Sequence, residues 1–224
     1  MRIFITGFQR SGTTLLRHVI NNHPNVNRIF HESSLLNKSE NCKLNIQKKI
    51  KPINIDKDTW GEKLPWFSPS KVKRYKGSII AYCKQWNSLF LPKAKIIQIV
   101  RNPYDVLNSN KKTFKISYRN TFRLMNYFPK IIPIIDDLPN CITIKFEKLV
   151  SDQFNTIKEL YKFLNLDYSD DIINDVINYK YRKFNKINPD RAFSYNDDEL
   201  DLFRKFNLKN IIITLNKFNG PIYK

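Results

Sequence analysis

Apolar runs and helically spaced apolar residues alternate along the N-terminal part of the chain. Residues 3–5 form an apolar run that stops at Gly7, which is the pattern of a buried parallel strand running into a turn. From Thr13 onward, apolar residues recur at helical spacing as far as His23-Pro24, where proline disfavours helical geometry in the residue before it. This part of the chain therefore predicts a strand, a loop and a helix.

Two further strand and helix pairs follow. Residues 95–100 (KIIQIV) predict a buried strand, and a polar helix follows from Pro103 to about Lys112, since proline is tolerated in the first turn of a helix. Residues 141–146 (CITIKF) predict a third strand, followed by a helix with one apolar face. Strands that alternate with helices predict an α/β fold, with a central parallel β-sheet flanked by helices in a single domain over residues 1–224.

The remaining segments have weaker patterns. Between the first two strands lie a lysine-rich loop, the segment DTWGEKLPWF at residues 58–67, which is assigned to neither helix nor strand, and a helix near 79–90. Residues 117–137 predict a helix interrupted by its two prolines, and residues 197–218 predict a C-terminal helix. Three residues of that last helix are expected in the core: Leu200, Phe203 and Phe206.

Composition supports a folded domain and adds a strong positive charge. The 224 residues are 42% hydrophobic and 13% aromatic, which excludes intrinsic disorder, collagen and coiled coils. Lys and Arg number 39 against 20 Asp and Glu, and the net charge of +19 indicates an anionic partner. The chain is also rich in Lys, Asn and Ile together, as biased base composition alone could produce. We therefore favour solvated basic faces beside an anionic small-molecule site over nucleic-acid binding.

The cysteines and the N-terminus bear on the compartment. Cys42, Cys83 and Cys141 are far apart, odd in number and without the close pairing of a zinc site. No stretch has the pattern of a signal peptide or of a membrane span. The sequence therefore predicts reduced, structural cysteines and a cytoplasmic location.

The string GFQRSGTT, residues 7–14, has the spacing of a phosphate-binding loop, with four residues between two glycines. Backbone N–H groups in such a loop bind an anion at the N-terminus of the following helix. An ATPase has lysine after the second glycine, whereas this chain has Thr13 there and a cation, Arg10, three places upstream. A guanidinium can hold a tetrahedral anion with two donors. The alternative is a chance match with Arg10 as a surface charge.

The ends of the other two strands favour a second anion over a metal. The second strand ends in Arg101 and the third in Phe146-Glu147, so magnesium-assisted phosphoryl transfer from ATP loses support. Arg101 and Ser109 could both reach one further phosphate. The alternative is that Arg101 caps a loop and Ser109 lies on a solvated helix face. Two such sites at the carboxyl ends of parallel strands indicate a nucleotide with phosphates at two positions.

These motifs resemble the sulfotransferases that use 3′-phosphoadenosine-5′-phosphosulfate (PAPS). RSGTTLLR (residues 10–17) resembles the family's 5′-phosphosulfate loop, RNPYDVLNS (101–109) its 3′-phosphate motif, and residues 146–166 its following strand and helix. The resemblance implies a P-loop NTPase-like sulfotransferase fold, PAPS as co-substrate and no metal.

The branch with tyrosylprotein and related carbohydrate sulfotransferases is the most similar. Its members often carry HPxV and then a catalytic glutamate, which here correspond to HPNV (23–26) and Glu32. Its Lys-x-Pro signature corresponds to Lys63 in WGEKLP. The offset to Glu32 differs by a residue or two, so His31 is an alternative base. The C-terminal segment matches poorly, and Lys186 and Tyr195 are only candidates there.

The resemblance also implies a role for each site residue. Arg10 and Lys63 would hold the sulfuryl and bridging oxygens, and Glu32 would act as general base. Arg101 and Ser109 would bind the 3′-phosphate. Four loop residues would bind the 5′-phosphate: Ser11, Gly12, Thr13 and Thr14.

Each role has a simpler alternative. Glu32 could cap a following helix, His31 could be structural, and Lys63 could be a surface residue. Trp60, Trp66 and Phe67 could line an acceptor cleft or belong to the core.

The predicted function is sulfuryl transfer from PAPS to an acceptor hydroxyl, on a carbohydrate or glycolipid first and on a tyrosyl peptide second. The alternatives are a P-loop kinase and a basic nucleic-acid-binding protein with a vestigial nucleotide site.

Overall fold

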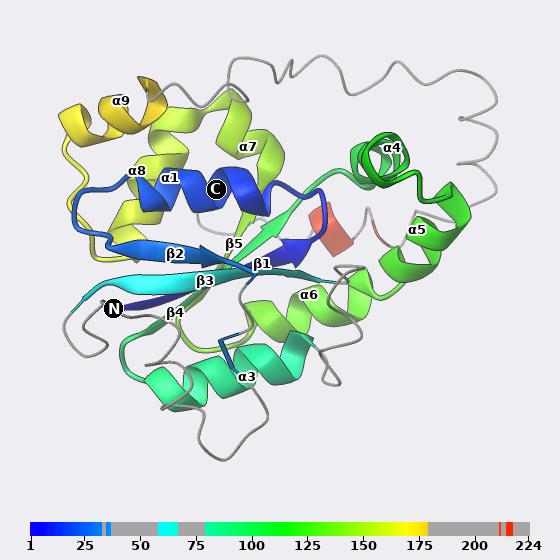
Figure 1. Cartoon of the computed structure of the whole chain (residues 1–224), viewed down its shortest axis with the longest axis horizontal. Coiled ribbons are helices and arrows are strands. Elements are labelled where there is room, and N and C mark those ends of the chain that lie inside the picture. The colour runs from blue at the N-terminus through cyan, green and yellow to red at the C-terminus, as the bar shows by residue number, and fades with distance from the viewer. Residues whose placement is uncertain (33–34, 37–57, 67–78, 179–210, 212–213, 217–224) are drawn as a thin grey trace.

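A computed structural model describes residues 1–32, 35–36, 58–66, 79–178, 211 and 214–216 (Figure 1). Within these residues, five strands form one fully parallel sheet in the order β2-β3-β1-β4-β5. The strands are β1 (Arg2–Phe8), β2 (Arg28–His31), β3 (Trp60–Trp66), β4 (Ala94–Val100) and β5 (Cys141–Lys145). The predicted parallel sheet flanked by helices is confirmed.

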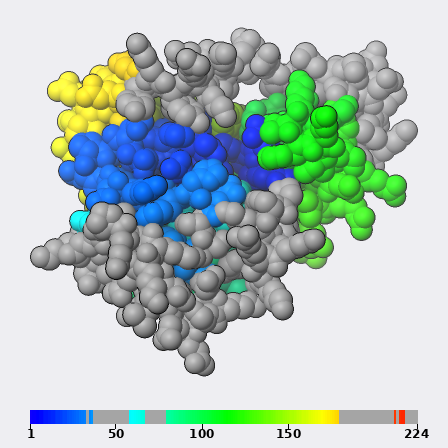
Figure 2. All heavy atoms as spheres, in the orientation of Figure 1, coloured from blue at the N-terminus to red at the C-terminus, as the bar shows by residue number. Residues whose placement is uncertain are grey.

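Helices cover both faces of the sheet. They are α1 (Thr13–Asn21), α3 (Ile79–Phe90), α4 (Pro103–Phe114), α5 (Tyr118–Met125), α6 (Phe128–Asp136), α7 (Phe146–Ser151), α8 (Gln153–Phe163) and α9 (Asp170–Asn178). Figure 1 shows α1, α7, α8 and α9 on one face and α3 and α6 on the other, with α4 and α5 beyond the carboxyl ends of the strands. The space-filling view shows residues 1–32 between α9 on one side and α4 and α5 on the other (Figure 2).

Two hydrophobic cores lie on the two faces because successive strand residues point to opposite sides. Along β1, Ile3 and Ile5 belong to the core formed with α1 and α8. Phe4 and Phe8 belong to the core formed with α3 and α6, where the Phe4 ring stacks on Tyr82 at 5.0 Å. Burial on both faces explains why β1 is a continuous apolar run.

The sequence patterns did not predict β2 and β3. Strand β3 contains glycine, glutamate, lysine and proline, which are all disfavoured in strands. Gly61 is required by packing, because a Cβ atom there would lie 1.9 Å from the carbonyl oxygen of Ile3 in β1. Strand β2 ends at His31, which pairs with Lys63, so Pro65 lies beyond the end of β2. At Pro65 only β1 remains as a neighbouring strand, and no pairing with β2 is lost.

Two predicted boundaries are wrong. Residues 117–137 form two helices, in which Pro129 is the second residue of α6 and Pro133 lies inside α6 without ending it. Phe146 begins α7 and is not the last residue of the third strand.

Several other predictions fall only partly on the described residues. Of the predicted C-terminal helix, residue 211 and residues 214–216 are helical, whereas Leu200, Phe203 and Phe206 lie outside the described residues. The extent of the domain over residues 1–224 stays a prediction. Within the described parts of the chain, no helix has the length and apolar character needed to cross a membrane.

The two cysteines that the structure describes are free thiols at the α3 face. Cys83 is buried in α3, and Cys141 is the first residue of β5. Burial raises the pKa of both thiols, which makes them poor nucleophiles at neutral pH. Cys42 lies outside the described residues.

Replacing Gly61 by alanine should destabilise the protein, because the added Cβ atom would force β3 away from β1. We expect Gly61→Ala to lower the free energy of unfolding by at least about 2 kcal/mol in urea denaturation. Asn174→Ala, at an exposed helical position, is the control and should change it by less than about 0.5 kcal/mol. Equal effects of the two variants would mean that the backbones of β1 and β3 can separate without cost.

Candidate active site

The loop between β1 and α1 is shaped by glycine and by close packing. Gly12 has φ +98°, and a Cβ atom there would lie 2.3 Å from the ring of Phe146. The Ser11 N–H donates to the carbonyl oxygen of Phe8 at 3.0 Å. Gly12 also caps α1, whose N-terminus has no side-chain cap and no acidic residue in its first turn. The N–H groups and dipole of α1 therefore favour an anion at this loop.

Two loop residues predicted to bind the anion are buried. The Ser11 side chain is 1% exposed, and among the described residues its hydroxyl has no hydrogen-bond partner. Thr13, the first residue of α1, is 4% exposed. A buried hydroxyl without a partner is costly, and a bound oxyanion would satisfy it.

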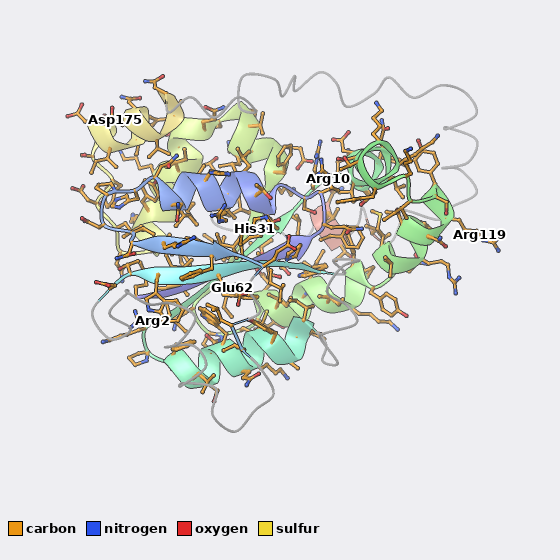
Figure 3. The ribbon with its side chains drawn as sticks, in the orientation of Figure 1. Arg2, Arg10, His31, Glu62, Arg119 and Asp175 are labelled. Atoms are coloured by element: carbon orange, nitrogen blue, oxygen red, sulfur yellow. The ribbon has the colours of Figure 1, made fainter. Side chains whose placement is uncertain are left out.

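The two predicted anion sites meet at Arg10. Its Nε donates to Ser109 Oγ on α4 at 2.9 Å, and Arg101 Nη1 donates to the Arg10 carbonyl oxygen at 3.1 Å. Strands β1 and β4 are parallel neighbours, so the residues that follow them lie at the same edge of the sheet. Figure 3 shows Arg10 at this edge, beside α4. The structure thus brings Arg10 next to Arg101 and Ser109, which are 91 and 99 residues away in the sequence.

The Arg10 guanidinium is perturbed by its surroundings. Partial burial, and secondly the charge of Arg101, lower the pKa of Arg10. Arg101 lies 4.2 Å above the ring of Phe146, and its Nη2 is 3.7 Å from Asp105 Oδ2. Clustered cations in a partly desolvated site favour a bound anion.

Phe146 has a positioning role that the sequence did not reveal. Its ring supports Arg101 and fills the space that a side chain at Gly12 would need. The available signal was its place directly after the third parallel strand.

Glu147, in the first turn of α7, binds a backbone N–H group through its carboxylate. Glu147 Oε1 accepts from the Asn102 N–H at 2.7 Å, and the Asn102 side chain caps α4 by accepting from the Tyr104 N–H. Beside them lies a cavity of about 330 Å³, lined by Arg101, Asn102, Glu147, Tyr104 and Leu215 among others. Within the described residues, no group of three or more His, Cys, Asp or Glu side chains could hold a metal ion.

A second charged cluster joins β2 to β3. Lys63 Nζ donates to Glu32 Oε1 at 2.8 Å and lies 3.2 Å from His31 Nε2. The Glu32 backbone N–H donates to the Lys63 carbonyl oxygen at 2.8 Å, and His31 pairs with Lys63 in the sheet. The parallel pairing of β2 and β3 thus places the three side chains together.

Burial distinguishes the members of this cluster. The Lys63 side chain is 2% exposed, Glu32 17% and His31 51%. The interpretation of Lys63 as a surface residue is therefore wrong. A buried ammonium needs a partner, and Glu32 supplies the negative charge.

The aromatic residues around Lys63 belong to the core. Trp60 packs edge-on against Trp86 at 5.8 Å, and Trp66 against Phe128 at 5.6 Å. Both tryptophans are almost fully buried, so they do not line a cleft.

His23, the first residue of the HPNV string, is also structural. Its Nδ1 accepts from the Asn25 N–H, so its Nε2 carries the proton and donates to the Asp167 carbonyl oxygen at 2.8 Å. The candidates Lys186 and Tyr195 lie outside the described residues.

The family profile described as the sulfotransferase domain matches residues 1–209. The chain belongs to the sulfotransferase family. No curated protein has a significantly similar sequence. The predicted family and enzyme class are confirmed.

Solved sulfotransferase structures share the fold. Mouse sulfotransferase SULT7A1 complexed with PAP is 15% identical over 94% of this chain and 83% of its own, with a TM-score of 0.59. The sulfotransferase from Alicyclobacillus acidocaldarius is 13% identical over 97% of this chain and 95% of its own, with a TM-score of 0.58. The sulfotransferase domain of the Synechococcus PCC 7002 olefin synthase is 17% identical over 96% of this chain and 94% of its own, with a TM-score of 0.57. These similarities confirm the predicted sulfotransferase fold.

The ion pair of Lys63 and Glu32 should contribute to the stability of this sulfotransferase because Lys63 is buried. In a double-mutant cycle of Lys63→Met and Glu32→Gln, we expect a coupling of about 1–3 kcal/mol in the free energy of unfolding. The exposed pair of Lys158 and Asp170, whose charged atoms are 3.4 Å apart, is the control and should give less than about 1 kcal/mol. Similar couplings in the two cycles would mean that water screens Lys63 despite its burial.

Proposed function

We propose that this sulfotransferase transfers the sulfuryl group of PAPS to an acceptor hydroxyl and releases adenosine 3′,5′-bisphosphate. The observation that carries the proposal is the buried Lys63 paired with Glu32, which follows the end of β2 just as Arg10 and Arg101 follow the ends of β1 and β4 in the same parallel sheet. The similar fold of a mouse sulfotransferase complexed with PAP supports it.

The donor nucleotide would bind along the ends of β1 and β4. Ser11, Gly12, Thr13 and Thr14 would bind the 5′-phosphate through backbone N–H groups and hydroxyls. The buried Ser11 hydroxyl fits this role, since it has no partner among the described residues. Arg101 and Ser109 would bind the 3′-phosphate, and the Ser109 hydroxyl can donate to it while its oxygen still accepts from Arg10 Nε.

In-line transfer needs charge stabilisation on the leaving side. The bond between sulfur and the bridging oxygen breaks, and its electron pair leaves with adenosine 3′,5′-bisphosphate. Arg10 and Lys63 would stabilise this developing negative charge, and a buried ammonium is effective because little water competes with it.

On the acceptor side, Glu32 would take the proton from the attacking hydroxyl as the new bond between oxygen and sulfur forms. Its ion pair with Lys63 favours the ionised carboxylate that a base requires. When the sulfuryl group draws Lys63 toward its oxygens, Glu32 is released to accept the proton. We propose a carbohydrate or glycolipid hydroxyl as acceptor, because the pairing of Glu32 with Lys63 fits the resemblance to that branch of the family.

Donor binding can be tested without knowing the acceptor. In calorimetric titrations with EDTA present, we expect adenosine 3′,5′-bisphosphate to bind more tightly than 5′-AMP, and Arg101→Ala to weaken only the former, by about 10- to 100-fold. Equal weakening of both ligands would exclude Arg101 as the 3′-phosphate ligand. A preference for magnesium-ATP would favour a kinase. Steeply salt-dependent nucleic-acid binding that the nucleotide does not displace would favour a nucleic-acid-binding protein.

The base role is tested by kinetics of transfer from PAPS to a panel of carbohydrate and glycolipid acceptors. Glu32→Gln should lower kcat by about 10²- to 10⁴-fold and leave the affinity for adenosine 3′,5′-bisphosphate within about twofold. His31→Gln is the comparison, since His31 is the other candidate base. A larger loss of kcat in His31→Gln than in Glu32→Gln would assign the proton transfer to His31.

A further inference from the structure

Strand β3 contacts the chain after β2 from both faces of the sheet. Glu62 and Lys63 are consecutive, so their side chains point to opposite faces. Lys63 shares the α1 face with Ile5, to which it is paired, and binds Glu32. Glu62 shares the α3 face with Phe4, and Figure 3 shows it on the side of the sheet opposite His31.

Glu62 is a fully buried carboxylate that holds the backbone near Glu32. Its Oε2 accepts from the Leu35 N–H at 3.0 Å and its Oε1 from the same group at 3.3 Å. Glu62 also accepts from the hydroxyl of Tyr82 on α3. That hydroxyl in turn accepts from the Leu36 N–H at 3.2 Å. Two consecutive buried N–H groups are therefore held by two linked side chains.

The Glu32 side chain and Leu35 lie on opposite faces of the sheet. Glu32 meets Lys63 on the α1 face, whereas Leu35 and Leu36 are 0% and 1% exposed in the core on the α3 face. Three residues span at most about 11 Å. Because Leu35 is held in place, the positions open to Glu32 are limited. Glu32 itself has φ +48°, a backbone conformation that costs free energy and persists only where the surrounding structure imposes it.

We propose that Glu62 and Tyr82 are positioning residues that hold Glu32 against Lys63. They act through the backbone of Leu35 and Leu36 and do not touch the reacting groups. The inference rests on the proposed function only in that Glu32 is the general base. A buried carboxylate is suited to this task because charge-assisted bonds to N–H groups are stronger than neutral ones.

The test is whether Tyr82 controls the coupling between Glu32 and Lys63. Tyr82→Phe removes the hydroxyl and keeps the ring that stacks on Phe4. The double-mutant cycle of Lys63→Met and Glu32→Gln is repeated in the Tyr82→Phe background. We expect the coupling, expressed as a ratio of unfolding equilibrium constants, to fall at least threefold. Glu62→Gln should cause a smaller fall, because its amide oxygen can still accept from the Leu35 N–H.

Tyr161→Phe is the matched control. Tyr161 is also fully buried, and its hydroxyl donates to the Val19 carbonyl oxygen at 2.8 Å on the other face of the sheet. This variant should destabilise the protein by a similar amount while the coupling stays unchanged. A purely structural role of Tyr82 predicts the same result for Tyr82→Phe, and that result would overturn the proposal.

Activity with PAPS separates this proposal from the proposed function. Tyr82→Phe should lower kcat at least fivefold and shift the acidic limb of the pH profile of kcat upward, because Glu32 would lie farther from Lys63. His31, 3.9 Å from Glu32 Oε1, faces the same carboxylate and is kept unchanged. If Glu32→Gln remains active while the coupling still depends on Tyr82, the base assignment fails and the positioning stands. If Glu32→Gln is inactive and Tyr82→Phe changes neither coupling nor kcat, the positioning fails alone.

Discussion

Burial of the Lys63 ammonium in an interior parallel strand is the constraint on which the position of Glu32 depends. An unpaired buried charge costs several kcal/mol, so a carboxylate must come to it. Glu32 does so because β2 ends beside Lys63, where the backbone of Glu32 is also hydrogen-bonded to β3. The need to pair one cation thus determines where the chain leaves β2.

The cluster of Arg10 and Arg101 has a different kind of charge arrangement. Arg10 and Arg101 are both cations, and their mutual contact places positive charge at the N-terminus of α1. Packing holds them there, since Phe146 fills the space beside Gly12 and supports Arg101. One cluster is thus neutralised within the protein, whereas the other is suited to an anion from outside.

Each cluster lies where parallel strands end, since Glu32 follows β2, whereas Arg10 and Arg101 follow β1 and β4. Strand β3 lies between β1 and β2. It packs closely on β1 at Gly61 and pairs with β2 at Lys63. Its polar residues Glu62 and Lys63 hold Leu35 and Glu32, which accounts for their presence in a strand. His23, by contrast, contributes only to the packing of α1 against the end of α8.

The sequence by itself determined the elements with strong local patterns: β1, β4 and β5 with their helices, and the loop that contains Arg10. Apolar periodicity and glycine spacing are local, so they can be read without the fold. The tertiary structure alone decided that Trp60–Trp66 is a central strand, because partners on both sides outweigh the weak strand propensity of its residues. It also decided that Lys63 meets Glu32 and that Glu62 meets Leu35, because these contacts arise only when distant strands pair.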